Sequence, residues 1–266
     1  MPVPVPPATF IISMAKRKRS FKRSYRRRTR KVPKTSKNAS KSNLVRLIKT
    51  VVNRQIESKE RQITIGPITV RQLISDLNVV TLMPGIAQGT GETNRIGNSV
   101  KPVSCRLKMS LYCFNQGVTT PPTYFDIFIF KTKFINENAG SPSALDMQLF
   151  LDNNNGATSY DGDTFDGIRP LNDELFKLCV RKRIMLFNPF NATNQLSSTA
   201  SVNPSRTVTF DLTKYVKSVL QFDDNTILAT NDNLYLAVGT TQTDGVKNSI
   251  DYGSYSALVD WKFKDA

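Results

Sequence analysis

The stretch "VSCRLKMSLYCF", residues 103–114, has the most regular pattern in this 266-residue chain. Apolar and polar side chains alternate along it, as they do along a β-strand with one face in a core and the other in water. The face expected to be buried consists of Val103, Cys105, Leu107, Met109, Leu111 and Cys113. This long alternation predicts a β-strand at the centre of the fold.

Further stretches also predict strands. Residues 207–215 and 255–264 alternate in the same way. The segment "YFDIFIFKTKF", residues 124–134, is apolar on both faces at its centre, as expected of a strand covered on both sides. Weaker runs lie near residues 60–70, 76–83, 175–187 and 233–242. With one short helix expected at 143–151 and long connections between about eight strands, the pattern predicts a two-sheet sandwich of the jelly-roll type.

The N-terminal part of the chain differs sharply from the rest. Residues 15–41, "AKRKRSFKRSYRRRTRKVPKTSKNASK", hold fourteen Lys or Arg and no acidic residue. Residues 1–56 hold seventeen basic residues in all, whereas residues 57–266 hold 20 basic and 21 acidic residues. A segment with so much like charge cannot offset its ordering entropy by burial. We therefore expect an all-β protein, a single eight-stranded jelly-roll sandwich preceded by a disordered Arg-rich N-terminal arm.

The expected domain limits follow this change in composition. Residues 1–42 form the basic arm, and residues 58–266 form the jelly roll. Between them, residues 43–57 have apolar side chains at helical spacing and are either an amphipathic helix or the first strand. The opening "MPVPVPPATFIIS" does not have the charged start and long apolar run of a secretory signal. Met14 is an alternative start, which would make residues 1–13 an upstream extension.

The arm predicts a nucleic-acid partner, because dense Lys and Arg neutralise phosphates and release counterions without regard to base sequence. Phe21 and Tyr25 lie among these cations and are candidates for stacking on unpaired bases, although an incidental placement is an equal alternative. Clusters of this kind also act as nuclear import signals. The residues expected to bind nucleic acid are Lys16, Arg17, Lys18, Arg19, Lys22, Arg23, Arg26, Arg27, Arg28, Arg30 and Lys31.

The sequence offers little support for catalysis. It contains no His, which excludes His-dependent triads and His metal sites. The carboxylates of Asp161, Asp163 and Asp166 are weak candidates for a divalent cation, because their spacing departs from the EF-hand pattern. A solvated surface loop is the simpler interpretation. No cofactor is expected, and Cys105 and Cys113 are too far apart on one strand, roughly 26 Å, to form a disulfide.

One short motif extends the argument from composition to a family. The segment "NRIGNSVKPVSCRLKMSLYCFNQ", residues 94–116, resembles the Arg-Ile-Gly-Asn stretch before a long strand in capsid proteins of circular, Rep-encoding single-stranded DNA viruses, the circoviruses and their relatives. The arm from Met14 resembles the arm of the same group. The resemblance implies a T=1 icosahedral shell of identical subunits, packaging of single-stranded DNA by the arm, and passage through the host nucleus with import receptors and a cell-surface receptor as partners.

The residues of this motif also have a local interpretation. Gly97 and Asn98 suit a tight turn with positive φ. Arg95 would then lie at the entrance of the strand, where it could contact another subunit or, as we favour, bond to a loop carbonyl.

Three other interpretations remain open from the sequence. A coat protein of a small RNA virus or satellite would have the same arm and sandwich. A cellular single-strand-binding protein would be expected to place cations and aromatic residues on its folded domain, whose net charge here is −1. A hydrolase would have to use carboxylates such as those of Asp161, Asp163 and Asp166.

Overall fold

The computed structural model describes residues 43–48, 58–70, 79–114, 122–134, 142–153, 156–186, 204–224, 226–242 and 253–265. The chain divides into two units, Met1–Thr50 and Val51–Ala266. In the first unit, residues 43–48 form a short helix with exposed side chains. The rest of the 43–57 segment, including most of the stretch expected to be helix or strand, lies outside the described residues.

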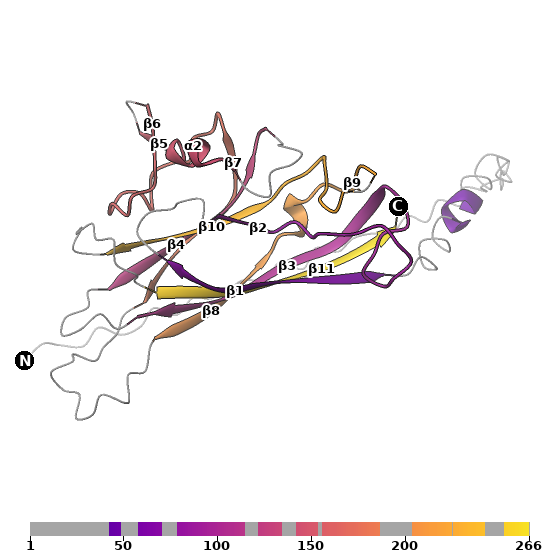
Figure 1. Ribbon diagram of the computed structural model, residues 1–266, viewed down its shortest axis with the longest axis horizontal. Helices are drawn as coiled ribbons and strands as arrows, with labels where there is room; N and C mark the ends of the chain where they lie inside the picture. The colour runs from indigo at the N-terminus through magenta and orange to yellow at the C-terminus, as the bar shows by residue number, and fades with distance from the viewer. Residues whose placement is uncertain are drawn as a thin grey trace, which may run out of the picture. The chain divides into compact units, whose positions relative to one another are not determined.

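The second unit is built around two antiparallel sheets (Figure 1). The first sheet has, in spatial order, β1 (Lys59–Val70), β11 (Gly253–Asp265), β3 (Ser99–Cys113) and β8 (Ser205–Asp211). A short strand, β9 (Leu220–Gln221), pairs with the start of β3. The second sheet has β2 (Val79–Thr81), β10 (Tyr235–Gln242), β4 (Thr123–Thr132) and β7 (Phe176–Leu186).

The order of these strands defines the fold. If the eight strands of the two four-stranded arrays are numbered along the chain, the arrays have the orders 1-8-3-6 and 2-7-4-5. Chain neighbours therefore lie in opposite sheets, except that strands 4 and 5 (β4 and β7) pair within one sheet, as in the two interlocked Greek keys of a jelly roll. The expected fold class is confirmed, and each of the eight segments expected to be strands overlaps one of these strands. The strand expected at 207–215 was drawn too long, because β8 ends at Asp211 and Thr213–Tyr215 form a short 3-10 helix.

The connection between β4 and β7 contains the remaining regular structure. The expected helix is present as α2 (Ala144–Gln148), and Ser143 caps its first turn in a capping box with Asp146. A small hairpin follows, formed by β5 (Leu151–Asn153) and β6 (Gly156–Thr158), which the sequence pattern did not indicate. Among the described residues, no helix is long and apolar enough to cross a membrane.

A shared core lies between the two sheets, because alternate side chains of β3 and β11 point into it. Leu107 pairs with Val259 and Met109 with Ala257, and all four are buried. One expectation about this face is wrong: Val103 is 45% exposed. A bulge in the pairing of β3 with β11 skips Val103, which shifts the alternation by one residue at that point.

A second apolar cluster covers the outer face of the β2-β10-β4-β7 sheet. Phe128 and Phe130 of β4 point away from the shared core and pack against Phe150, with ring centroids 5.3 and 5.2 Å apart. Phe176 and Tyr160 join the same cluster. The expectation that β4 is covered on both faces is therefore confirmed, and the cover is the 142–175 segment.

Arg95 closes the loop before β3 from inside the protein. Its side chain is fully buried, and it donates to the carbonyl oxygens of Gly97, Asp223 and Thr226 and to the side chain of Asn98. The favoured role, a structural bond to loop carbonyls, is confirmed. The expected positive φ at Gly97 is wrong. The described glycines with positive φ are Gly89, Gly156 and Gly162.

Candidate functional site

The residues expected to bind nucleic acid lie outside the described part of the chain. All eleven basic residues, together with Phe21 and Tyr25, belong to the 1–42 segment. Their role therefore stays a prediction. The other candidates, Asp161, Asp163 and Asp166, are described, and they lie in the connection between β6 and β7, above the second sheet.

The structure brings these three carboxylates together. One oxygen from each lies within 4.8 Å of the others. Asp166 is completely buried, and its Oδ2 accepts the backbone N–H groups of Asp161 and Asp163 at 2.9 and 3.0 Å. Its Oδ1 accepts a hydrogen bond from Arg169 at 2.6 Å. Both oxygens of Asp166 thus hold the loop closed, and Arg169 already supplies a positive charge where a cation would bind.

Burial affects the ionisation of this cluster. The pKa of Asp166 is raised to about 6, first by burial and then by the neighbouring Asp161. The amide groups of Asp161 and Asp163 act in the opposite direction, because they stabilise the ionised carboxylate. The cluster is therefore a turn closed by hydrogen bonds to a carboxylate. The charge of that carboxylate, Asp166, changes at mildly acidic pH.

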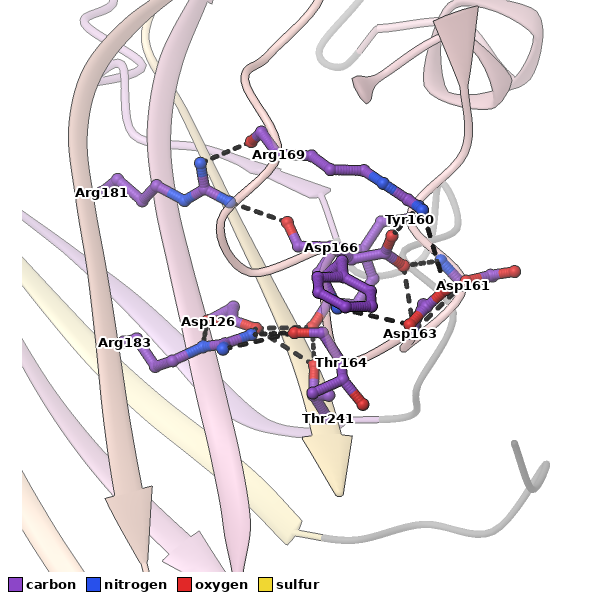
Figure 2. A network of polar contacts seen from close by, with 11 residues as sticks. Asp126, Tyr160, Asp161, Asp163, Thr164, Asp166, Arg169, Arg181, Arg183 and Thr241 are labelled. Carbon is purple, nitrogen blue, oxygen red and sulfur yellow. Dashed lines mark hydrogen bonds and ion pairs between the residues drawn. The ribbon is translucent and has the colours of Figure 1, made fainter. Parts of the chain in front are cut away.

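A second polar network lies directly beneath the loop, on the outer face of the sheet (Figure 2). Asp126 of β4 is buried and forms a bidentate pair with Arg183 of β7, with N–O distances of 2.7 and 2.9 Å. Its Oδ2 also accepts hydrogen bonds from Tyr160 at 2.9 Å and from Thr241 of β10 at 3.2 Å. Three neighbouring strands and the loop therefore meet at one carboxylate.

Two arginines of β7 connect the sheet to the loop backbone. Arg181 donates to the carbonyl oxygens of Asp166 and Arg169 at 2.7 and 2.5 Å. Arg183 lies 3.4 Å from the carbonyl oxygen of Thr164. Figure 2 shows both guanidinium groups reaching from the strand toward the loop. The bonds from Arg181 satisfy partly buried carbonyls of the loop, whereas the contact of Arg183 with Thr164 is exposed.

The pKa values of these groups follow from their surroundings. Burial, and then the charge of Asp126, hold the pKa of Tyr160 well above its ordinary value, so the hydroxyl stays protonated and donates. The hydrogen bond with Asp126 raises the pKa of Arg183. Burial lowers the pKa of Arg181. The network is a fixed set of donors around Asp126, and its chemistry is that of a structural brace.

Two glycines allow the loop to approach the sheet this closely. A Cβ atom on Gly167 would lie 1.5 Å from the guanidinium of Arg183. A Cβ atom on Gly239 of β10 would lie 2.4 Å from the ring of Tyr160. Glycine is required at both positions because a side chain would collide with this network. The backbone conformation is not the reason, since neither residue has a positive φ.

The sequence interpretation missed Asp126, Arg181 and Arg183 as members of a site. A signal was present: an Asp at the centre of an apolar strand requires a partner, because an unpaired buried carboxylate is costly. Arg181 and Arg183 stand two residues apart and therefore on one face of β7. The pairing of β4 with β7, which places Asp126 opposite Arg183, could not be obtained from either segment alone.

Comparisons with known proteins find only low similarity. No protein-family model and no curated protein matches the chain. It is similar to the cryo-EM structure of T=3 Penaeus vannamei nodavirus, with 11% identity and a TM-score of 0.32, over 79% of this chain and 54% of that chain. It is also similar to Merkel cell polyomavirus VP1 in complex with GD1a oligosaccharide, with 12% identity and a TM-score of 0.26, over 79% and 97% of the two chains.

The chain thus spans about half the length of the nodavirus chain that it matches. At these TM-scores the similarities carry no argument about fold or function. The class of this protein, a jelly-roll domain with a basic N-terminal extension, rests on its own strand order and charge distribution.

Proposed function

We propose that this chain is the coat protein of a small icosahedral virus, in which jelly-roll domains form the shell and the N-terminal arm holds the genome. The observation that carries the proposal is the division of charge. Seventeen basic residues and no acidic residue precede residue 57, and a domain of net charge −1 follows. A nearly neutral domain can pack against copies of itself, while the arm needs a polyanion to neutralise it.

The genome is proposed to be circular single-stranded DNA in a T=1 shell. The support is the resemblance of the arm and of residues 95–98 to circovirus-like capsid proteins. Phosphate contacts alone do not distinguish DNA from RNA. A coat protein of a small RNA virus or satellite is therefore the second candidate, and a cellular single-strand-binding protein is a more distant one. No catalytic role is proposed.

The arm is also proposed to direct the protein to the host nucleus. Clusters such as Lys16-Arg17-Lys18-Arg19 and Arg26-Arg27-Arg28 have the composition of basic import signals. A fluorescent protein fused to residues 14–41 should accumulate in the nucleus. Cytoplasmic retention of this fusion would count against a nuclear stage.

Gradient-purified particles test the main proposal. The full-length protein should form closed shells that contain nucleic acid, seen by electron microscopy and by the ratio of absorbance at 260 and 280 nm. Protein without residues 1–41, if it assembles, should form empty shells, because it has lost fourteen positive charges. Digestion of the extracted genome by DNase or RNase separates the two candidates. Full-length shells without nucleic acid at physiological salt would exclude the proposed role of the arm.

Salt dependence gives a quantitative form of the same proposal. For single strands, the logarithm of the binding constant falls with the logarithm of salt at about −0.7 per neutralised phosphate. With half to all of the arm cations engaged, the expected slope is about −5 to −10. Filter binding of single-stranded DNA at several salt concentrations measures it. A slope near zero would mean that the arm does not bind through phosphates.

A further inference from the structure

The loop above the polar network presents two large apolar side chains to solvent. Phe165 is 59% exposed and Ile168 is 66% exposed, although the two residues between them, Asp166 and Gly167, are buried. The N–H of Ile168 donates to the carbonyl oxygen of Phe165 at 2.8 Å. The N–H of Arg169 donates to the same oxygen at 2.9 Å, so the backbone makes one helical turn, in which side chains at positions i and i+3 are neighbours on one face. The two apolar side chains therefore form one small outward surface, here called the Phe165–Ile168 tip.

The tip is held in place from below by several hydrogen bonds. The carbonyl oxygens of Thr164, Asp166 and Arg169 all accept hydrogen bonds from Arg181 or Arg183. The carboxylate of Asp166 fixes the backbone on the N-terminal side of the turn. A surface that is rigid before binding loses little conformational entropy when it binds. Single exposed apolar side chains are normal on protein surfaces, whereas adjacent ones on a rigid turn can serve as a binding surface.

The charge of the segment that carries the tip indicates what it binds. The covering segment 142–175 holds seven acidic residues and one basic residue. The remainder of residues 57–266 holds 19 basic and 14 acidic residues. The domain is thus nearly neutral as a whole, but its charge is divided. Residues 142–175, here called the acidic cover, carry net negative charge, and the rest of residues 57–266, here called the basic remainder, carry net positive charge. Two covers would repel one another, whereas the cover of one copy and the remainder of another attract.

We propose that the Phe165–Ile168 tip is a contact between subunits, in which the acidic cover of one copy docks on the basic remainder of a second copy of this chain. This inference rests on the proposed function and assigns one of its assembly contacts. The contact is heterologous, since different surfaces of the two copies meet, and such contacts generate rings when they close. The apolar side chains supply the buried centre, and the surrounding charges select the orientation.

Replacement of both tip residues tests the contact in the full-length protein. The variant Phe165→Ser/Ile168→Ser should retain the circular dichroism of wild type and its affinity for single-stranded DNA. It should lose closed particles on gradients and in electron micrographs, with subunits remaining as small species. The matched control Phe165→Leu/Ile168→Leu keeps apolar side chains and should assemble like wild type. Shells formed by the Ser variant at the wild-type subunit concentration would overturn the inference.

A second measurement does not depend on these variants. If opposite charges orient the contact, the subunit concentration needed for assembly of the wild type should rise with ionic strength by more than the loss of affinity for single-stranded DNA over the same range accounts for. A threshold that follows the DNA affinity alone would overturn the docking of acidic cover on basic remainder. The two proposals fail differently. Wild-type protein that forms no shell contradicts the proposed function and the contact with it, whereas wild-type shells together with Ser-variant shells contradict the contact alone.

Discussion

The two sheets of this jelly roll share one core but differ on their outer faces. On the β2-β10-β4-β7 sheet, the 142–175 segment covers strand β4, whose central residues are buried on both faces. On the β1-β11-β3-β8 sheet, polar residues such as Lys108 and Ser110 alternate with core residues and face water. Each outer face has a cross-strand ion pair, Asp126–Arg183 on the covered sheet and Asp260–Lys108 on the open one. The same pairing chemistry should therefore have very different consequences in the two places.

The largest expected difference comes from removing one carboxylate from each pair. Asp126→Ala leaves the Arg183 guanidinium and the Tyr160 hydroxyl without their buried acceptor, which should lower the free energy of unfolding by about 3–5 kcal/mol. Asp260→Ala removes a pair whose lysine is 53% exposed, so the expected loss is about 0–1 kcal/mol. Urea unfolding of both variants measures these losses. Equal losses would show that the cover does not desolvate the Asp126 pair.

The sequence predicted the open sheet better than the covered one, for a physical reason. A strand with one face in water shows its structure as alternation, so Cys105 to Cys113 could be assigned to the core directly. The exception was Val103, because a bulge is set by the pairing partner and leaves no mark on the periodicity. The sequence of strand β4 indicated that both of its faces are covered, but it did not indicate which segment covers the outer one.

The candidate site was predictable only where its members are neighbours in sequence. Asp161, Asp163 and Asp166 were found together because six residues contain all three. Their connection to Arg181 and to the Asp126–Arg183 pair depends on how the loop folds back over the sheet. Asp126 and Arg183 are 57 positions apart in the chain, and no local pattern specifies that they meet.

Replacing one glycine in each sheet should give a difference in stability of intermediate size. Gly239 of the covered sheet has the Tyr160 ring where a Cβ atom would stand, so Gly239→Ala must displace Tyr160 from Asp126. The expected loss of unfolding free energy is about 1–3 kcal/mol. Gly66 of β1, on the open sheet, has no atom within 4 Å of an added Cβ. Gly66→Ala should leave stability unchanged or raise it by up to about 1 kcal/mol. Thermal or urea unfolding distinguishes the two, and a destabilising Gly66→Ala would mean that something covers the open sheet in solution.

The smallest expected effect is a difference in sign between the pH dependences of the stability contributed by Asp166 and by Asp211. On the covered side, burial and then Asp161 raise the pKa of Asp166 to about 6, from an ordinary value of 3.8. Between these values the folded protein binds more protons than the unfolded chain, so stability falls as the pH rises and is constant above about 6. On the open side, hydrogen bonds from Thr213 lower the pKa of Asp211. Its contribution to stability is present above the ordinary value of 3.8 and is lost as the pH falls through the lowered pKa.

Asn substitutions isolate the two contributions, because an amide does not titrate. Relative to Asp166→Asn, wild type should lose about 1 kcal/mol as the pH rises from about 4 to about 6, less than the full pKa shift implies because Arg169 and the edge of the loop remain partly in water. Relative to Asp211→Asn, wild type should be more stable at neutral pH, and this advantage should disappear in acid. Urea unfolding of the three proteins from pH 3 to pH 7 gives both difference curves. Curves of the same sign would mean that the cover does not keep water from Asp166, and the contrast between the two sheets would then be one of shape and not of solvation.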